Sequence, residues 1–224
     1  MEFYILDYSL EPKKSAQLYG FDPGYILLEV FKQGDLGYHD FPKEKVVFSG
    51  LHLKRGSVLV DFICPMGAYG GFGYLISENA KTIVENFNLP KHKFYQLPIL
   101  EFKQKAYQYY YMQILHNPYD FSFIDFEKST FLKTDFFQEN YTEVLFKNGV
   151  ELKHALDNLD DLEEKILPDE IVFNDAFLKS NLDMFQLDGL YFPFIINSKI
   201  HKAFLENNLT GIVMTKVEVT LKQK

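Results

Sequence analysis

The sequence has little of the chemistry used for covalent staples or for nucleic-acid recognition. Cys64 is the only cysteine among 224 residues, which excludes an intramolecular disulfide and a cysteine-built zinc site. Arg55 is the only arginine, the residue type best suited to recognise phosphate and guanine. Together with a net charge of −8, this scarcity argues against a nucleic-acid partner. No apolar run approaches the roughly 18 residues of a membrane-spanning helix, so we expect no membrane partner.

The first residues also lack a targeting pattern. Residues 1–7 have neither a basic stretch nor the uninterrupted apolar run of a secretory signal. We therefore expect a cytoplasmic protein. A chain of this length can bury about 70% of its surface on folding, which is enough for a core without a metal or disulfide.

Motifs for catalysis and metal binding are missing as well. No two of the six histidines lie within five residues of each other, which excludes a short-spaced metal-binding pair. No Gly-x-Ser-x-Gly nucleophile elbow is present, and the glycine-rich residues 67–73 lack the spacing of a phosphate-binding loop. We predict a protein that is not an enzyme and has no cofactor and no metal. An enzyme whose site assembles near residues 67–73 stays open as an alternative.

Charge is distributed unevenly along the chain. Residues 135–190 carry 14 acidic and 4 basic side chains, a net charge of −10, whereas residues 1–134 are nearly neutral. Such a segment suits attraction of a basic partner, although a solvated face that favours solubility would look the same. If the segment is an interface, we predict that its partner-binding residues are Asp157, Asp160, Asp161, Glu163 and Glu164.

Patterning predicts an α+β fold with a mostly antiparallel sheet and a few helices packed on it. Short apolar, β-branched and aromatic runs separated by Gly and Pro predict strands, and runs spaced at three and four residues predict helices. The predicted domains are a β-rich N-terminal subdomain, 1–72, and an α+β domain, 73–224. The predicted strands are 3–8, 25–31, 46–48, 57–62, 94–97, 106–115, 124–126 and 170–173. The predicted helices are 77–88, which begins at the N-cap Ser77, and a helix over 152–162 that Pro168 ends.

Two segments of the chain resemble each other. Residues 77–86 and 198–207 share Ser, Lys, Glu and Asn at matched positions, and an apolar pair precedes each segment. A strand is expected after each. The sequence therefore suggests an internal pseudo-repeat built as strand, Ser-capped helix, Asn-rich exit and strand.

A tyrosine-rich strand lies between the two similar segments. In residues 106–115, Tyr107, Tyr109 and Tyr111 fall on one face, and Tyr110 and Met112 on the other. Two aromatic faces indicate either burial on both sides or an exposed recognition patch.

The tyrosine-rich residues 109–114, followed by Ile-Asp-Phe-Glu-Lys-Ser-Thr-Phe over 124–131, resemble a bacterial family of immunity proteins from polymorphic toxin systems, once known as a domain of unknown function. That family has a Ser-capped helix, a tyrosine-rich strand, an I-D-x-x-x-S-x-F stretch, a second Ser-led helix and a T-G-I turn. The resemblance covers about residues 73–219. The family often carries a tryptophan, and this sequence has none. The family-motif positions are Tyr110, Asp125, Ser129, Phe131, Ser198 and Gly211.

The resemblance implies a cytoplasmic protein that binds and neutralises a cognate toxin without catalysis or a cofactor. The acidic segment would then be the interface and would suit a basic toxin. A structural or regulatory interaction module without a toxin stays open as an alternative.

Overall fold

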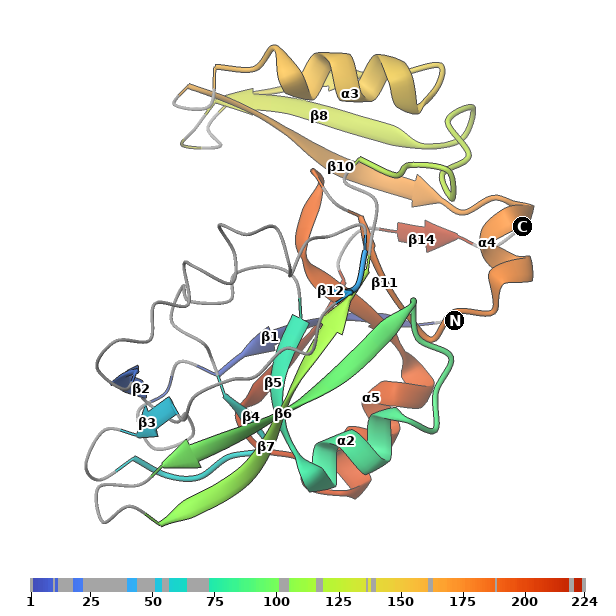
Figure 1. The fold of residues 1–224 in the computed structure, drawn as a ribbon. Helices are drawn as coiled ribbons and strands as arrows, with labels where there is room; N and C mark the ends of the chain where they lie inside the picture. Colours follow the sequence, from blue (N-terminus) through green and yellow to red (C-terminus); the bar gives the residue numbers. More distant parts are fainter. Residues whose placement is uncertain are drawn as a thin grey trace.

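The computed structural model describes residues 2–9, 11, 18–21, 40–43, 51–53, 57–63, 73–100, 105–115, 119–135, 137, 140–160, 163–187, 189–217 and 220–222. Their strands form three sheets with the orders β11-β12-β1-β13, β14-β10-β8-β9 and β2-β3-β6-β7-β5-β4. Most neighbouring strands are antiparallel, and only β3 with β6 and β10 with β14 are parallel pairs in this part of the chain. The predicted α+β fold with a mostly antiparallel sheet is therefore confirmed (Figure 1).

One strand–helix–strand unit occupies the middle of the chain. It consists of β4 (Phe62–Ile63), β5 (Gly73–Ser77), α2 (Glu78–Val84), β6 (His92–Leu100) and β7 (Ala106–Ile114). Strand β7 lies between β5 and β6 and is antiparallel to both. Two short strands, β2 (Leu18–Phe21) and β3 (Leu51–Leu53), extend this sheet beyond β6.

The second unit combines the two ends of the chain. It consists of β11 (Met184–Leu187), β12 (Tyr191–Asn197), α5 (Ser198–Glu206), β13 (Ile212–Lys216) and, from the N-terminus, β1 (Phe3–Tyr8). Strand β1 lies between β12 and β13 and is antiparallel to both, as β7 is in the first unit. The N-terminal strand thus completes a unit whose other elements lie at the C-terminal end.

The two units have the same strand register, so the predicted pseudo-repeat is present. Residue Ser77 pairs with Tyr109 on β7, and Asn197 pairs with Phe3 on β1. On the other side of the central strands, Ile114 pairs with His92 and Tyr8 pairs with Ile212. The edge strands agree too, because β4 and β11 pair with β5 and β12 one residue after an aspartate, Asp61 or Asp183.

The structure corrects the predicted alignment by one residue. The predicted N-cap Ser77 is confirmed, since its side chain accepts a hydrogen bond from the backbone of Ala80. In the second unit the cap is Asn197, and Ser198 is the first helical residue. Asparagine is as good an N-cap as serine, so either Asn197 or Ser198 suits the position. The sequence pattern favoured Ser198, and the structure has Asn197.

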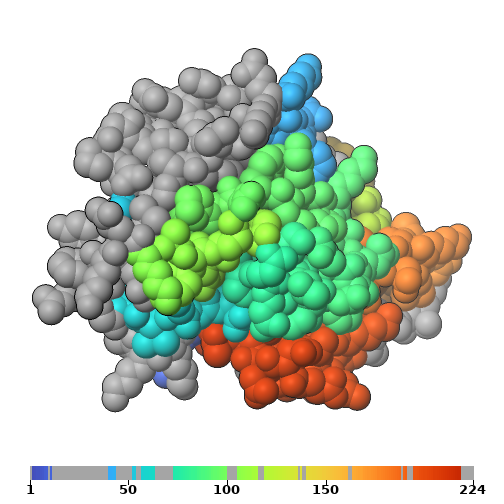
Figure 2. All heavy atoms as spheres, turned by 60° about the horizontal axis from the view of Figure 1, so that its bottom comes forward, coloured from blue at the N-terminus to red at the C-terminus, as the bar shows by residue number. Residues whose placement is uncertain are grey.

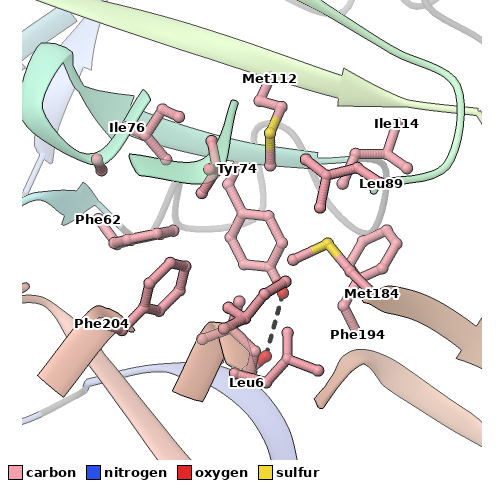
Figure 3. Packing of buried hydrophobic residues seen from close by; sticks show 14 residues of the cluster. Leu6, Phe62, Tyr74, Ile76, Leu89, Met112, Ile114, Met184, Phe194 and Phe204 are labelled. Carbon is pink, nitrogen blue, oxygen red and sulfur yellow. Dashed lines mark hydrogen bonds between the residues drawn. The ribbon is translucent and has the colours of Figure 1, made fainter. Parts of the chain in front are cut away.

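Equivalent residues of the two units form one shared core (Figure 3). Helices α2 and α5 lie side by side on one face of the molecule (Figure 2) and pack over this core. The rings of Tyr74 and Phe194, which occupy the same position in the two units, meet with centroids 5.5 Å apart. The Tyr74 hydroxyl donates to the carbonyl oxygen of Leu6, so the one polar group of this pair is satisfied.

Two aspartates connect the units reciprocally. Asp61 accepts a hydrogen bond from the side chain of Ser77 (2.7 Å), the cap of its own unit, and one from the backbone N–H of Thr210 (3.0 Å), in the loop after α5. Asp183 accepts from the side chain of Asn197 (2.7 Å), its own cap, and from the backbone N–H of Asn88 (2.9 Å), in the loop after α2. Each unit therefore holds the helix exit of the other.

Asp183 is more buried than Asp61, and its surroundings favour the charged form of its carboxyl group. Asp183 is 6% exposed. Burial acts to raise the pKa of this carboxyl, but the hydrogen bonds from Asn88, Asn197 and Lys199 outweigh it and lower the pKa below its ordinary value. The charged carboxylate therefore stabilises the folded protein.

A third group of elements comes from the chain between the units, with one strand from the C-terminal end. Helix α3 (Gly149–Asp157) covers a sheet of β8 (Thr130–Asp135), β9 (Tyr141–Val144), β10 (Glu164–Val172) and β14 (Thr220–Lys222), and α4 (Asp175–Ser180) leads back to β11. Figure 1 shows this layer on the side away from α2 and α5. Its core includes Phe3, Phe185 and Ile195 from the opposite face of the second unit's sheet. Strands β1, β11 and β12 of that sheet therefore contribute residues to a core on both faces.

The structure differs from several predicted elements. Residues 124–126 form a turn with one isolated bridge rather than a strand, and the strand begins later, at Thr130. The helix over 152–162 ends at Asp157, and Pro168 lies inside strand β10. Proline is tolerated there because the pairing of β10 with β8 is irregular between Pro168 and Glu170.

Other predictions fall on the part of the chain without a description. The predicted strands 25–31 and 46–48, Cys64 and residues 67–72 lie outside the described residues. Strands from residues 1–72 pair with strands from residues 73–224 in two of the sheets, at β1 and at β3 and β4. The domain boundary at residue 72 stays a prediction.

We expect Asp183→Ala to lower the free energy of unfolding by about 3 kcal/mol, because it leaves the buried donors of Asn88 and Asn197 without an acceptor. Urea denaturation at pH 7 measures this. Asp157→Ala, which removes an exposed carboxylate, serves as the control and should cost less than about 1 kcal/mol. Equal effects of the two substitutions would contradict the role assigned to Asp183.

The same pair of proteins should differ less in acid. Because the folded-state pKa of Asp183 is lowered, its contribution is present above the ordinary carboxyl pKa, about 3.9, and is lost as the pH falls through the folded-state value. The difference in unfolding free energy between wild type and Asp183→Ala should therefore shrink below about pH 4. A difference that stays constant from pH 7 to pH 3 would rule out a contribution from the ionised carboxylate.

Candidate protein-binding surface

Exposed apolar side chains gather around strand β9. Phe137 is 79% exposed, Tyr141 52%, Leu145 67% and Val150 78%. They follow one another over fourteen residues that lead into and out of the strand. Single exposed apolar residues are normal on protein surfaces, and the short sequence distance between these four makes the segment a candidate for an interface.

Strand β9 is the edge of its sheet. In the described part of the chain it pairs with β8 alone, from Phe131 opposite Val144 to Thr134 opposite Tyr141. Its other side presents a row of backbone N–H and C=O groups, which is a template for another strand.

Acidic side chains lie at the same end of this sheet. In the register of three adjacent strands, Lys165 on β10 stands opposite Thr134 on β8, which stands opposite Tyr141 on β9. The next pair outward is Glu164 opposite Asp135. Since neighbouring strands are about 4.8 Å apart, the backbone of Tyr141 lies close to that of the acidic pair, but Thr134 and Asp135 are consecutive, so the Tyr141 ring points to the other face of the sheet. We call Asp135, Tyr141, Glu163 and Glu164 the acidic sheet end.

The acidic sheet end is not arranged for stability. Glu164 and Asp135 are like charges directly opposite one another, a pairing that destabilises a sheet. Lys133 forms an ion pair of 2.7 Å with Glu164, and Asn140 donates a 2.7 Å hydrogen bond to Asp135, so the repulsion is reduced locally. The two carboxylates are thus partly compensated within the chain.

The structure brings most of the predicted acidic residues close together. The carbonyl oxygen of Asp160 accepts hydrogen bonds from the backbone N–H groups of Glu163 (2.8 Å) and Glu164 (2.7 Å), which forms a turn between α3 and β10. Asp157 ends α3, where a negative charge is unfavourable to the helix dipole, and pairs with Lys153 at 2.7 Å. Accepting this hydrogen bond, Asp157 raises the pKa of Lys153. Asp161 lies outside the described residues.

The motif residues Asp125, Ser129 and Phe131 have structural roles. The Ser129 hydroxyl donates to the carbonyl oxygen of Asp125 (2.8 Å) and accepts from the backbone N–H of Val172 (3.0 Å). Phe131 is fully buried and meets the ring of Phe146 edge-on at 5.3 Å. The I-D-x-x-x-S-x-F stretch thus fastens the turn before β8 to strand β10.

The tyrosine-rich strand β7 is buried on both faces, so packing accounts for most of its aromatic residues. Tyr109, Tyr111 and Met112 are at most 5% exposed. The half-buried Tyr110 donates a hydrogen bond to the Glu78 carboxylate, and this bond raises the pKa of Tyr110 to about 12. The predicted alternative of burial on both sides is confirmed for this strand.

The remaining motif residues, Ser198 and Gly211, hold the second unit together. The backbone N–H of Ser198 donates to the carbonyl oxygen of Glu2 (3.0 Å). Gly211 has a φ of +86°, and a Cβ there would lie 2.1 Å from the carbonyl oxygen of Phe62. Only glycine fits this contact between the T-G-I turn and strand β4.

The sequence reasoning missed Asp61 and Asp183, which hold the units together. A signal was present, because each aspartate is followed by two large apolar residues and precedes a helix cap by 16 or 14 residues. This signal lies upstream of the helices, outside the two segments that resemble each other.

Tests for other kinds of site are negative within the described ranges. The residues there form no group of three or more His, Cys, Asp or Glu side chains placed to hold a metal ion. None of the helices described is long and apolar enough to cross a membrane. No protein-family model matches the chain, and no curated protein matches it.

We expect Gly211→Ala to destabilise the protein by more than about 2 kcal/mol, because the new methyl group collides with the Phe62 backbone and the residue keeps a positive φ. Gly149→Ala is the control, since its Cβ would meet a side chain, that of Phe121, at 3.1 Å, and its φ is ordinary. Thermal unfolding compares the two. A Gly149→Ala effect as large as that of Gly211→Ala would contradict the steric argument.

Proposed function

We propose that this protein is a cytoplasmic immunity protein that binds and neutralises a cognate bacterial toxin, and that the inserted layer of α3, β8, β9 and β10 makes the contact. The observation that carries the proposal is the acidic sheet end, where like charges stand opposite each other on β8 and β10 and the neighbouring edge strand carries the exposed Tyr141. The toxin as partner is taken from the resemblance of residues 73–219 to immunity proteins.

A basic toxin fits this surface by its charge. Cationic side chains of a partner would reduce the repulsion between Asp135 and Glu164. This reduction would contribute favourably to the free energy of binding. Complementary charge also accelerates encounter and fixes orientation. Tyr141 supplies a rigid aromatic group of the type that anchors protein interfaces.

The mechanism is occlusion. A surface of acidic and apolar groups can cover the basic substrate-binding face of a nuclease-like toxin, and such neutralisation needs no bond to form or break. The role of the two repeated units is then to hold the inserted layer rigidly.

A non-toxin interaction module would use the same surface for another basic protein. Co-expression with the toxin domain encoded by the neighbouring gene separates the two functions. The immunity function requires that the chain restore growth and co-purify with the toxin in a stable complex. Continued toxicity with no complex would favour the module.

Charge reversal of the predicted interface, with lysine at Asp157, Asp160, Asp161, Glu163 and Glu164, should weaken toxin binding about tenfold or more, chiefly through slower association. The salt dependence of the association rate should diminish with it, because the attraction is screened electrostatics. Surface plasmon resonance at two salt concentrations measures both.

A control variant reverses exposed acids elsewhere, at Glu127, Asp175 and Glu206. It should bind with an affinity close to that of the wild type. If both variants lose affinity equally, net charge rather than the predicted interface governs binding, and the assignment of the site is wrong.

A further inference from the structure

In the described part of the chain the outer edge of β9 is unpaired, and it lacks three of the devices that commonly protect an edge strand, although the strand is short and carries Glu143. The residues of the strand, Tyr141 to Val144, include no proline and no lysine. Their pairing with β8 proceeds in unbroken register, without a bulge. Exposed edges that are free of prolines, lysines and bulges accept another strand readily.

Side chains at the edge could recognise an added strand. Tyr141 and Glu143 are two residues apart and therefore point to the same face of the sheet. Both are exposed, as is Leu145, the next residue on that face of the chain. Cross-strand neighbours on one face lie about 4.5–5.5 Å apart, close enough for each to contact a side chain of the incoming strand.

Charge decides which kind of strand fits. Residues 135–164 carry nine acidic side chains and two lysines. A second copy of this chain would bring its own acidic segment against this one and set like charges across the pair. A partner strand with lysine or arginine opposite Glu143, and an apolar residue opposite Tyr141, meets attraction at both positions.

We infer that β9 binds an extended, cationic segment of the partner by strand addition, which continues the sheet β14-β10-β8-β9 by one strand. The inference rests on the proposed function in that the partner is taken to be the toxin, and it adds the mode of recognition. Backbone hydrogen bonds along the edge provide the affinity, and Tyr141, Glu143 and Leu145 select the sequence that binds.

Strand β13 provides an internal comparison. It is also the edge of a sheet and exposes Val213 at 46%. It ends in Lys216, which pairs with Glu2, and belongs to residues 191–224, which carry a net charge of +3. A cationic strand should therefore choose β9 over β13.

A pair of synthetic peptides tests the inference without the toxin. Both are blocked nonapeptides in which every second residue is threonine. In the first peptide the residues between are lysine or valine, and in the second peptide glutamate replaces each lysine. We expect the lysine peptide to bind the full-length protein at least tenfold more tightly and to slow hydrogen exchange of the amides in residues 141–145. Equal affinities, no binding, or protection at β13 instead of β9 would overturn the inference.

Substitutions at the two edges provide a second measurement. Tyr141→Lys should reduce binding of the lysine peptide at least tenfold, because it removes the aromatic contact and adds a repelling charge. Val213→Lys makes the matched change on β13 and should leave the affinity unaltered. Size-exclusion chromatography and the midpoint of thermal unfolding show whether each variant is folded, and the exchange measurement on the wild type needs no variant.

Hydrogen exchange in the toxin complex separates the two proposals. A complex that restores growth but leaves the amides of β9 unprotected would overturn strand addition and leave the immunity function standing. If the lysine peptide protects β9 but the protein neither binds the toxin nor restores growth, strand addition is supported and the immunity function is overturned.

Discussion

The fold depends on the contact between two units that complete each other. Each buries its helix and one sheet face in the shared core. The carboxylates of Asp61 and Asp183 make the dependence specific, because each binds its own helix cap and the loop that leaves the other helix. Movement of one unit against the other would break charged hydrogen bonds at two places together.

The inserted layer, to which we assign recognition, is attached to this pair of units. The layer attaches through the second face of the β11-β12-β1-β13 sheet, where Phe3, Phe173 and Phe185 pack at centroid distances of 5.4–5.7 Å. Packing therefore restricts the side chains on the face of the layer that contacts this sheet. Strand β9 and the acidic sheet end lie at the edge of the layer, where packing restricts the side chains less. Side chains that oppose stability, such as the facing Asp135 and Glu164, are tolerated at such a place.

The motif residues and the proposed interface are different sets. Ser129, Phe131 and Gly211 are buried or sterically required, so they specify how elements join. Asp157, Glu163 and Tyr141 are exposed and make few contacts that the fold needs. A family resemblance carried by the first set indicates architecture, and the partner would be selected by the second.

Local patterns determined much by themselves: the cap at Ser77, the apolar face of α2, the strand nature of residues 106–114 and the excess of acid in residues 135–190 are all properties of neighbouring residues. The rest was decided by tertiary structure. The choice of Asn197 over Ser198 as cap depends on the bond from Asn197 to Asp183, and Pro168 is accepted in β10 because the ladder is irregular there. The pairing of β1 with β12 and β13, and of Glu164 with Asp135, joins residues far apart in the chain. Periodicity describes which face of an element is apolar but not which distant element covers it, and the candidate site exists only through such pairings.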